Sequence, residues 1–152
     1  MPTIVTPKFD IVREDIPFEQ GYFYKVIFPD KHTDKGYATL YFNPLEIYQG
    51  VYDLNHVCET SLQKGLEAWD LVAHLQTFYP HGSARKSEAM RQGVGTSFLN
   101  QIIEDSVSKG ARIMYTYATL YDALVTSAFE SFLRKNGFEE LTNFKRHYFR
   151  LL

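Results

Sequence analysis

The hydrophobic pattern of this chain changes its period near residue 96. Before that point, runs rich in aromatic and β-branched residues predict strands at 22–28 and 37–42, joined as a hairpin through the polar segment 29–36. After that point, apolar residues recur at intervals of three and four, which is typical of helices with one buried face. A chain with both patterns must pack helices on a sheet, so we predict an α+β fold.

The elements predicted after the hairpin alternate between the two periods. A weak strand comes first, and a half-buried strand follows in which the odd-numbered positions are mostly apolar. Then come a helix closed by Gly110, a strand, a second helix closed by Asn136-Gly137, and two short strands. Their ranges are 51–59, 69–79, 96–110, 111–119, 124–135, 138–141 and 147–152.

Length and composition restrict the class of protein. The chain has 152 residues, so we expect one domain over 1–152. A net charge of −2 argues against nucleic acid as a partner, because non-specific binding needs many Lys and Arg contacts to phosphate. The single cysteine, Cys58, excludes an intrachain disulfide. Without a signal-peptide pattern or an apolar run of about 18 residues, we expect a cytoplasmic protein that does not bind a membrane.

Glycines stand directly before the first predicted helix, in the segment Met90-Arg-Gln-Gly-Val-Gly-Thr-Ser97. Glycine lets the backbone approach a ligand closely, and the free N–H groups of a helix N-terminus favour an anion such as phosphate. A Walker A loop is excluded because Thr96, and not lysine, follows Gly95. A dinucleotide fingerprint is excluded because Phe98 stands where a small residue is required.

The glycine segment resembles the Gln/Arg-x-x-Gly-x-Gly/Ala loop of the GCN5-related N-acetyltransferase (GNAT) family. The resemblance covers about residues 68–152, and the segment 132–138 is similar to that family's aromatic-x-Lys-x-Gly-Phe ending. It implies a GNAT-like central mixed sheet of about six or seven strands flanked by helices. It also implies an acyl-CoA-dependent N-acyltransferase, with acetyl-CoA as acyl donor, that uses direct attack by an amine in a ternary complex.

The resemblance also implies which residues bind the cofactor. The glycine loop would hold the pyrophosphate, and the backbone near Phe78 would polarise the thioester carbonyl. Met90, Thr126 and Leu133 depart from the family pattern, which has Gln or Arg, a CoA-facing Asn, and a Tyr that can protonate the departing thiolate. The two helices that usually follow the family's first strand are not recognisable. The expected cofactor-binding residues are Thr77, Phe78, Arg91, Gln92, Gly93, Val94, Gly95, Thr96 and Thr126.

Transfer to an amine calls for a base, because a lysine-like amine has a pKa of about 10.4 and must lose a proton. Asp70 and His74 share the polar face of the predicted strand 69–79, roughly 13 Å apart, so one of them at most is the base. We favour His74, which titrates near neutral pH, although a structural role for it stays open. His56 and Glu59, on the preceding predicted strand, are lesser candidates.

Tyr121 and Tyr117 are the candidates for the general acid, with core packing as their competing role. The histidines have no metal-ligand spacing with Cys58 or with one another, so no metal is predicted. The expected acceptor is a small-molecule or peptide amine, and a homodimer is one assembly left open. Two other functions stay open: a catalytically inactive GNAT-fold domain that acts as a CoA-binding sensor or protein-interaction module, and a structural domain whose glycines merely open a helix.

Overall fold

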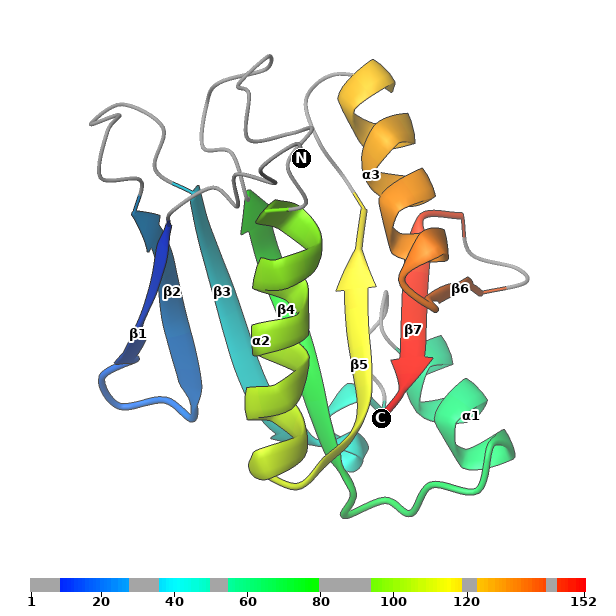
Figure 1. The fold of residues 1–152 in the computed structure, drawn as a ribbon. Helices are drawn as coiled ribbons and strands as arrows, with labels where there is room; N and C mark the ends of the chain where they lie inside the picture. The colour runs from blue at the N-terminus through cyan, green and yellow to red at the C-terminus, as the bar shows by residue number, and fades with distance from the viewer. Residues whose placement is uncertain (1–8, 28–35, 50–54, 80–93, 119–122, 142–144) are drawn as a thin grey trace, which may run out of the picture.

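Within the described residues, seven strands form one sheet with the order β1-β2-β3-β4-β5-β7-β6. The computed structural model describes residues 9–27, 36–49, 55–79, 94–118, 123–141 and 145–152 (Figure 1). The elements in chain order are β1 (Asp10–Asp15), β2 (Gly21–Ile27), β3 (Gly36–Pro44), the 3-10 helix η1 (Leu45–Tyr48), α1 (Asn55–Gln63), β4 (Leu71–Tyr79), α2 (Val94–Ser108), β5 (Ala111–Tyr117), α3 (Ala123–Lys135), β6 (Glu139–Glu140) and β7 (His147–Leu151).

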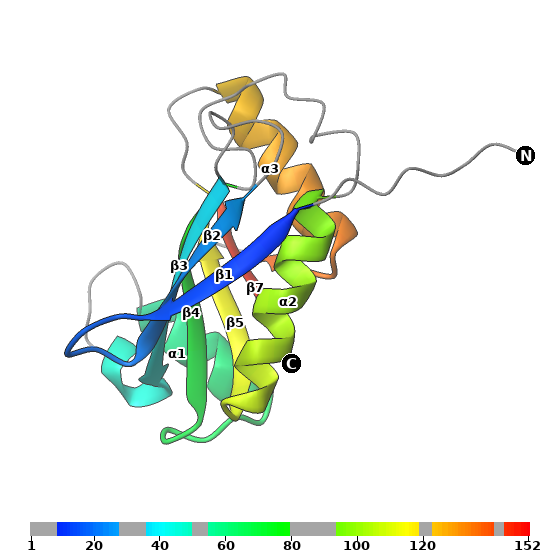
Figure 2. The ribbon, with the colours of Figure 1, turned by 60° about the vertical axis from the view of Figure 1, so that its left-hand side comes forward.

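The sheet is mixed, because β4 and β5 are parallel while all other neighbours are antiparallel. A parallel pair needs a crossover, and α2 supplies it. Figures 1 and 2 show α2 and α3 on one face of the sheet and α1 on the other. The predicted α+β architecture with six or seven strands is therefore confirmed. No described helix is both long enough and apolar enough to cross a bilayer.

Each face of the sheet has its own core. The larger core lies under α2 and α3 and includes Tyr24, Leu40, Leu75, Phe98, Leu99, Ile102, Met114, Leu133 and Tyr148. The smaller core lies under α1 and η1 and contains Leu45, Tyr48, Val57, Cys58, Leu66, Val72, Ile113, Tyr115, Leu141 and Phe149. Among the described elements, α2 and α3 thus cover one face of the sheet, and α1 and η1 cover the other.

In the first half of the chain, the structure differs from the predictions for one strand, for one element that was not predicted, and for one residue. The expected strand 51–59 is replaced in its described part by α1, whose buried residues Val57, Cys58 and Ser61 follow helical spacing. Its weak apolar content hides that period. Strand β1 was not predicted because it is an edge strand of mostly charged, exposed residues. Trp69 lies outside β4 and is 72% exposed, so it does not share the buried face assigned to it.

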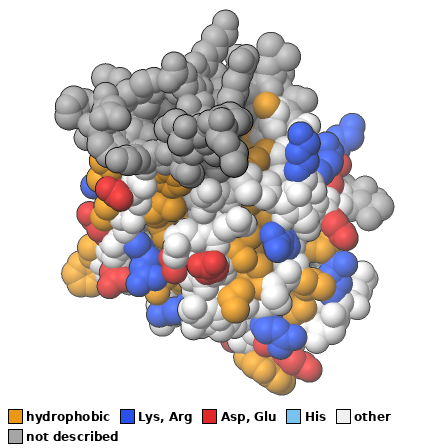
Figure 3. Space-filling model, viewed as in Figure 1, with side chains coloured by type: hydrophobic (Ala, Val, Ile, Leu, Met, Phe, Trp, Pro, Cys, Tyr) orange, Lys and Arg blue, Asp and Glu red, His pale blue; other side chains and the backbone are white. Residues whose placement is uncertain are grey.

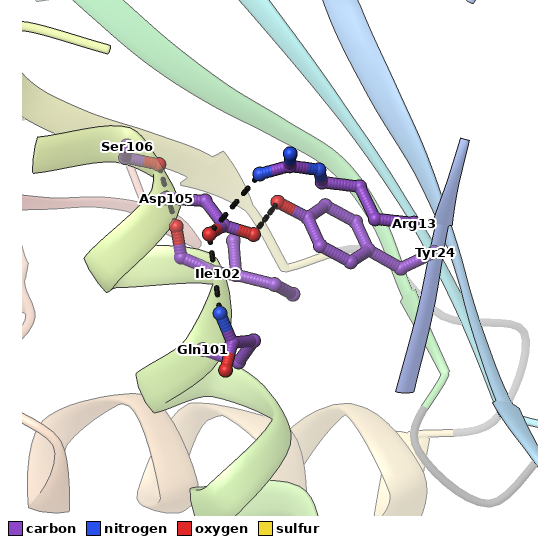
Figure 4. A network of polar contacts seen from close by, with 6 residues as sticks. All are labelled: Arg13, Tyr24, Gln101, Ile102, Asp105 and Ser106. Atoms are coloured by element: carbon purple, nitrogen blue, oxygen red, sulfur yellow. Dashed lines mark hydrogen bonds and ion pairs between the residues drawn. The ribbon is translucent and has the colours of Figure 1, made fainter. Parts of the chain in front are cut away.

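A polar network joins the edge of the sheet to α2 (Figure 4). The Asp105 carboxylate on α2 accepts hydrogen bonds from the Tyr24 hydroxyl at 2.8 Å and from Gln101 Nε2 at 3.1 Å. Arg13 of β1 lies 3.2 Å from the same carboxylate. Burial and the bond to Asp105 raise the pKa of Tyr24, so its hydroxyl remains a donor. The network fixes β1 and β2 against α2.

We predict that Asp105→Ala lowers the free energy of unfolding by about 1–3 kcal/mol. The substitution leaves the hydroxyl of Tyr24, a fully buried residue, without its acceptor. Urea denaturation measures the loss. Glu104→Ala is the matched control. This residue directly precedes Asp105 on α2 and is exposed, so its loss should change stability by no more than about 0.5 kcal/mol. Equal effects of the two substitutions would contradict the role of the network.

Candidate functional site

Strand β4 pairs unequally with its two neighbours. It pairs with β3 as far as Tyr79, which lies opposite Tyr37, but its pairing with β5 covers only Leu71–Leu75. At the last parallel pair, Thr116 Oγ1 donates a hydrogen bond to the Leu75 carbonyl oxygen at 2.8 Å. Figure 1 shows the two strands diverging toward their carboxyl ends. We call this divergence, between residues 76–79 of β4 and the end of β5, the β4–β5 splay.

A β-bulge at Gln76 marks the start of the splay. The register with β3 passes from the pair Leu40–Leu75 to the pair Thr39–Thr77, so Gln76 is the extra residue in β4. The bulge shifts by one residue which positions of the strand face the core. The prediction that odd-numbered positions face the core therefore holds for Ala73 and Leu75 but is wrong beyond Gln76, where Phe78 is the buried residue.

The side chain of Phe78 ties the splayed segment to both helices on its face. Its ring stacks on Phe98 of α2 at 5.3 Å and on Phe129 and Phe132 of α3 at 5.9 and 5.7 Å. Aromatic pairs at such distances contribute roughly 0.5–1.5 kcal/mol each beyond their burial. The segment after the bulge is therefore held in place by β3 and by the helices, without help from β5.

The backbone of the splayed segment offers hydrogen-bonding groups to a ligand. In an antiparallel ladder, alternate residues direct their N–H and C=O groups away from the partner strand. After Gln76 that direction leads into the splay, where the ladder with β5 has ended. The N-terminus of α2 begins at the same end of the sheet (Figures 1 and 2). Ligands of open sheets with parallel strands commonly bind at such carboxyl ends.

The expected cofactor-binding residues are only partly described. Thr77 lies in the splayed segment, and its hydroxyl donates to Thr39 Oγ1 across the β3–β4 pair at 2.7 Å. Gly95 is buried and Thr96 is exposed in the first turn of α2, which begins two residues earlier than expected. Arg91, Gln92, Gly93 and Tyr121 lie outside the described residues, as do the side chains of Val94 and Thr126.

His74 lies on the face of β4 opposite α2, one residue before the parallel pairing ends. Its ring lies 5.2 Å from that of Tyr115 and 6.0 Å from that of Tyr48. Burial lowers the pKa of His74 to about 4, because a charged imidazolium is poorly solvated there. The imidazole is therefore neutral at neutral pH and can accept a proton or a hydrogen bond.

Asp70 is not close to the splay. It precedes β4 at the opposite end of that strand, where Oδ2 accepts a hydrogen bond from the Glu67 amide at 2.7 Å. Its other oxygen lies 3.9 Å from the Arg112 guanidinium. The Asp70 carboxylate thus has structural partners in the turn before β4 and in an ion pair. The structure does not bring it together with His74.

The lesser candidates for the base lie in another element than predicted, whereas Tyr117 lies at the end of its predicted strand. His56 and Glu59 belong to α1 and not to a strand, and Glu59 accepts a hydrogen bond from Asn55 at 3.0 Å. Tyr117 ends β5 beside the splay, is 46% exposed, and stacks on His147 at 4.4 Å. Leu133 is fully buried in the larger core and offers no proton donor.

An open pocket of about 600 Å³ adjoins the bulge. Sequence reasoning identified one of its residues, His74. The others come from β3, β4 and the turn between β1 and β2, and only the sheet register brings them together, so no local motif could have found them. The lining residues are Glu19, Gln20, Tyr41, Phe42, Asn43, Pro44, Leu71, His74 and Gln76.

The described side chains form no metal-binding cluster. No group of three or more His, Cys, Asp and Glu residues gathers around a common point within the described part of the chain. On the face that Figure 3 shows, basic and acidic side chains are interspersed over the described surface. The site is thus defined by the splay, the helix start and the pocket.

We predict that His74 titrates near pH 4 in the folded protein. The unfolded chain binds this proton near pH 6.5, so the stability that the neutral ring contributes is complete above that pH and is lost as the pH falls toward 4. NMR titration of the imidazole gives the midpoint directly, and His74→Gln identifies its resonance. Denaturation at several pH values should show a smaller loss of stability between pH 6.5 and 4 in that variant. A midpoint near 6.5 would contradict the burial argument.

Comparison with known proteins agrees with this architecture. Neither a family model nor a curated protein matches the sequence. A structure of a mutant of the toxin AtaT, bound to the C-terminus of the antitoxin AtaR and acetyl-CoA, matches with a TM-score of 0.50 and 14% identity over 86% of this chain and 67% of that chain. AtaT complexed with acetyl-methionyl-tRNAfMet matches with a TM-score of 0.52 and 12% identity over 86% of this chain and 71% of that one. At such identities the likeness concerns the fold, and the fold is that of the GNAT proteins.

Proposed function

We propose that this protein is an acyl-CoA-dependent N-acyltransferase that uses acetyl-CoA and an amine acceptor. The observation that supports this most is the β4–β5 splay, which opens beside the N-terminus of α2 on one side and beside the His74 pocket on the other. Two substrates could then meet at the bulge from opposite sides. AtaT, whose fold is similar, binds acetyl-CoA.

The acyl donor fits the residues of this chain. The splayed segment of β4 provides backbone N–H and C=O groups beyond the end of its ladder with β5, as an extended amide-containing chain requires. The start of α2 provides N–H groups suited to phosphate. In this proposal Arg91, Gln92, Gly93, Val94, Gly95 and Thr96 hold the pyrophosphate, Thr77 and Phe78 hold the thioester end through their backbone, and Thr126 contacts CoA.

His74 would act on the acceptor. The acceptor amine attacks in its neutral form, and His74 accepts the proton that the nitrogen loses as the C–N bond forms, directly or through one water, while the pocket holds the rest of the acceptor in place. Acetyl-CoA supplies the activated acyl group: a C–N bond to the amine forms, the C–S bond breaks, and the sulfur leaves with the electron pair and is then protonated. Tyr117, at the end of β5, and Tyr121 are the proposed donors of that proton.

One observation favours a second candidate, a GNAT-fold domain that binds CoA without catalysis. Leu133 is buried where the related enzymes have a tyrosine, so α3 provides no acid at that position. Such a domain would act as a sensor or an interaction module. Both candidates bind acetyl-CoA, and they differ in whether CoA is released.

Two measurements on the full chain test the proposal. Calorimetric titration with acetyl-CoA should give saturable binding, and the absence of heat at high micromolar concentration would remove both candidates. Release of free CoA thiol is then followed with a panel of small amines, peptides and, because AtaT is described with acetyl-methionyl-tRNAfMet, an aminoacyl-tRNA. Binding without thiol release above background across this panel would favour the non-catalytic domain.

We predict that His74→Gln lowers kcat on the order of a hundredfold with little change in acetyl-CoA affinity. Gln keeps a polar side chain of similar size but cannot accept the proton. In the wild type, kcat should rise with pH toward the pKa of the acceptor and should show no step near pH 6.5, because the His74 pKa lies near 4. A pH–rate profile of normal height and shape in the variant would eliminate His74 as the base.

We predict that Gly95→Glu weakens acetyl-CoA binding at least tenfold. The substitution adds bulk and negative charge to the buried first turn of α2, where the pyrophosphate is proposed to bind. Calorimetry gives the affinity, and circular dichroism checks that the variant is folded. Ser108→Glu, an exposed position in the last turn of the same helix, is the control and should bind normally. Unchanged affinity in Gly95→Glu would mean that the pyrophosphate site is wrongly assigned.

A further inference from the structure

The charge distribution in the pocket points to the class of acceptor. Building on the N-acyltransferase proposed above, we infer that the acceptor is a dication, in which one amine is acylated beside His74 and a second positive charge binds Glu19. A terminal diamine is the simplest acceptor of this kind.

The pocket is acidic overall. Among the nine described residues that line it, Glu19 alone is charged at neutral pH, because burial keeps His74 neutral and none of the nine is Lys or Arg. The other polar groups are the Tyr41 hydroxyl and the side-chain amides of Gln20, Asn43 and Gln76. Such a lining attracts a cation and gives an anion no charged partner. A phosphate-rich ligand therefore fits this pocket poorly.

The backbone holds Glu19 at the edge of the pocket. Its amide donates to the Ile16 carbonyl at 3.4 Å, and the neighbouring Gln20 carbonyl accepts from the Phe42 amide of β3 at 2.8 Å. Gly21 makes this close approach to β3 feasible, since a Cβ there would lie 2.4 Å from the Leu40 carbonyl oxygen. The turn that carries Glu19 is thus fixed against the strand beside His74.

The Glu19 carboxylate is available for a ligand. Glu19 is exposed, and no described side chain forms an ion pair with it. Within the pocket, a cationic group therefore has its most favourable electrostatic interaction at this carboxylate.

The sheet register sets the spacing between His74 and the start of β2, which lies two residues after Glu19. Gly21 lies opposite Tyr41, and Tyr41 lies opposite His74. Two strand spacings, or roughly 10 Å, therefore separate the start of β2 from His74. A diamine of about that length, such as diaminooctane, is therefore a suitable probe.

The first test compares two ligands of equal length on the full chain without acetyl-CoA. Diaminooctane carries two amines, and aminooctanol replaces one of them with a hydroxyl. By NMR titration, the wild-type protein should bind diaminooctane about fivefold more tightly at low salt, and added salt should reduce this preference. Glu19→Gln should remove the preference. Glu104→Gln makes the same change of charge on α2, outside the pocket, and should keep it.

The second test measures thiol release from acetyl-CoA with the same two ligands. The inference predicts a lower KM for diaminooctane in the wild type and equal KM values in Glu19→Gln. Diamine-selective binding without thiol release would support the cation site and contradict the proposed transferase. Turnover of both ligands with equal KM in the wild type, or a preference that survives Glu19→Gln, would support the transferase and overturn the role of Glu19.

Discussion

The unequal pairing of β4 is the constraint on which the rest of this structure depends. Its antiparallel ladder with β3 runs to Tyr79, while its parallel ladder with β5 ends at Leu75. The bulge at Gln76 lies where the pairing with β5 has ended, and it turns the side chain of Phe78 into the core. Because Phe78 stacks on both α2 and α3, the helices replace β5 as the support of the splayed segment. The fold can thus open its central sheet without losing the order of β4.

This opening divides the molecule into two sides with different chemistry. On one side, the start of α2 lies at the carboxyl ends of β4 and β5, where backbone N–H groups suit an anionic donor. On the opposite face, a neutral His74 and the carboxylate of Glu19 line a pocket that suits a cationic acceptor. A donor with phosphates and an acceptor with positive charges would then approach the same bulge without competing for one surface. The proposed transferase activity follows from this arrangement of charges.

Strong periodicity in the sequence was sufficient to predict much of the fold. The hairpin of β2 and β3, the helices α2 and α3, and the final short strands were all recognised from patterns of apolar residues, and each was found. The pattern of apolar residues did not predict two elements that have few apolar residues and are held in place by tertiary contacts. Strand β1 is mostly charged and is held by β2 and by the pair Arg13–Asp105. Helix α1 buries only a short stripe around Cys58, too weak in apolar residues for its helical spacing to be recognised.

The sequence predicted less of the candidate site than of the fold. The sequence by itself determined the glycine-rich entry to α2 and the polar residue His74 on a half-buried strand, because both depend on neighbours in the chain. Only the tertiary structure decided that Asp70 lies at the far end of that strand, that Leu133 is buried, and that Glu19 faces the same pocket as His74. These outcomes depend on the strand register and on a bulge of one residue. Residues far apart in the chain set the register together, so no local pattern contains it.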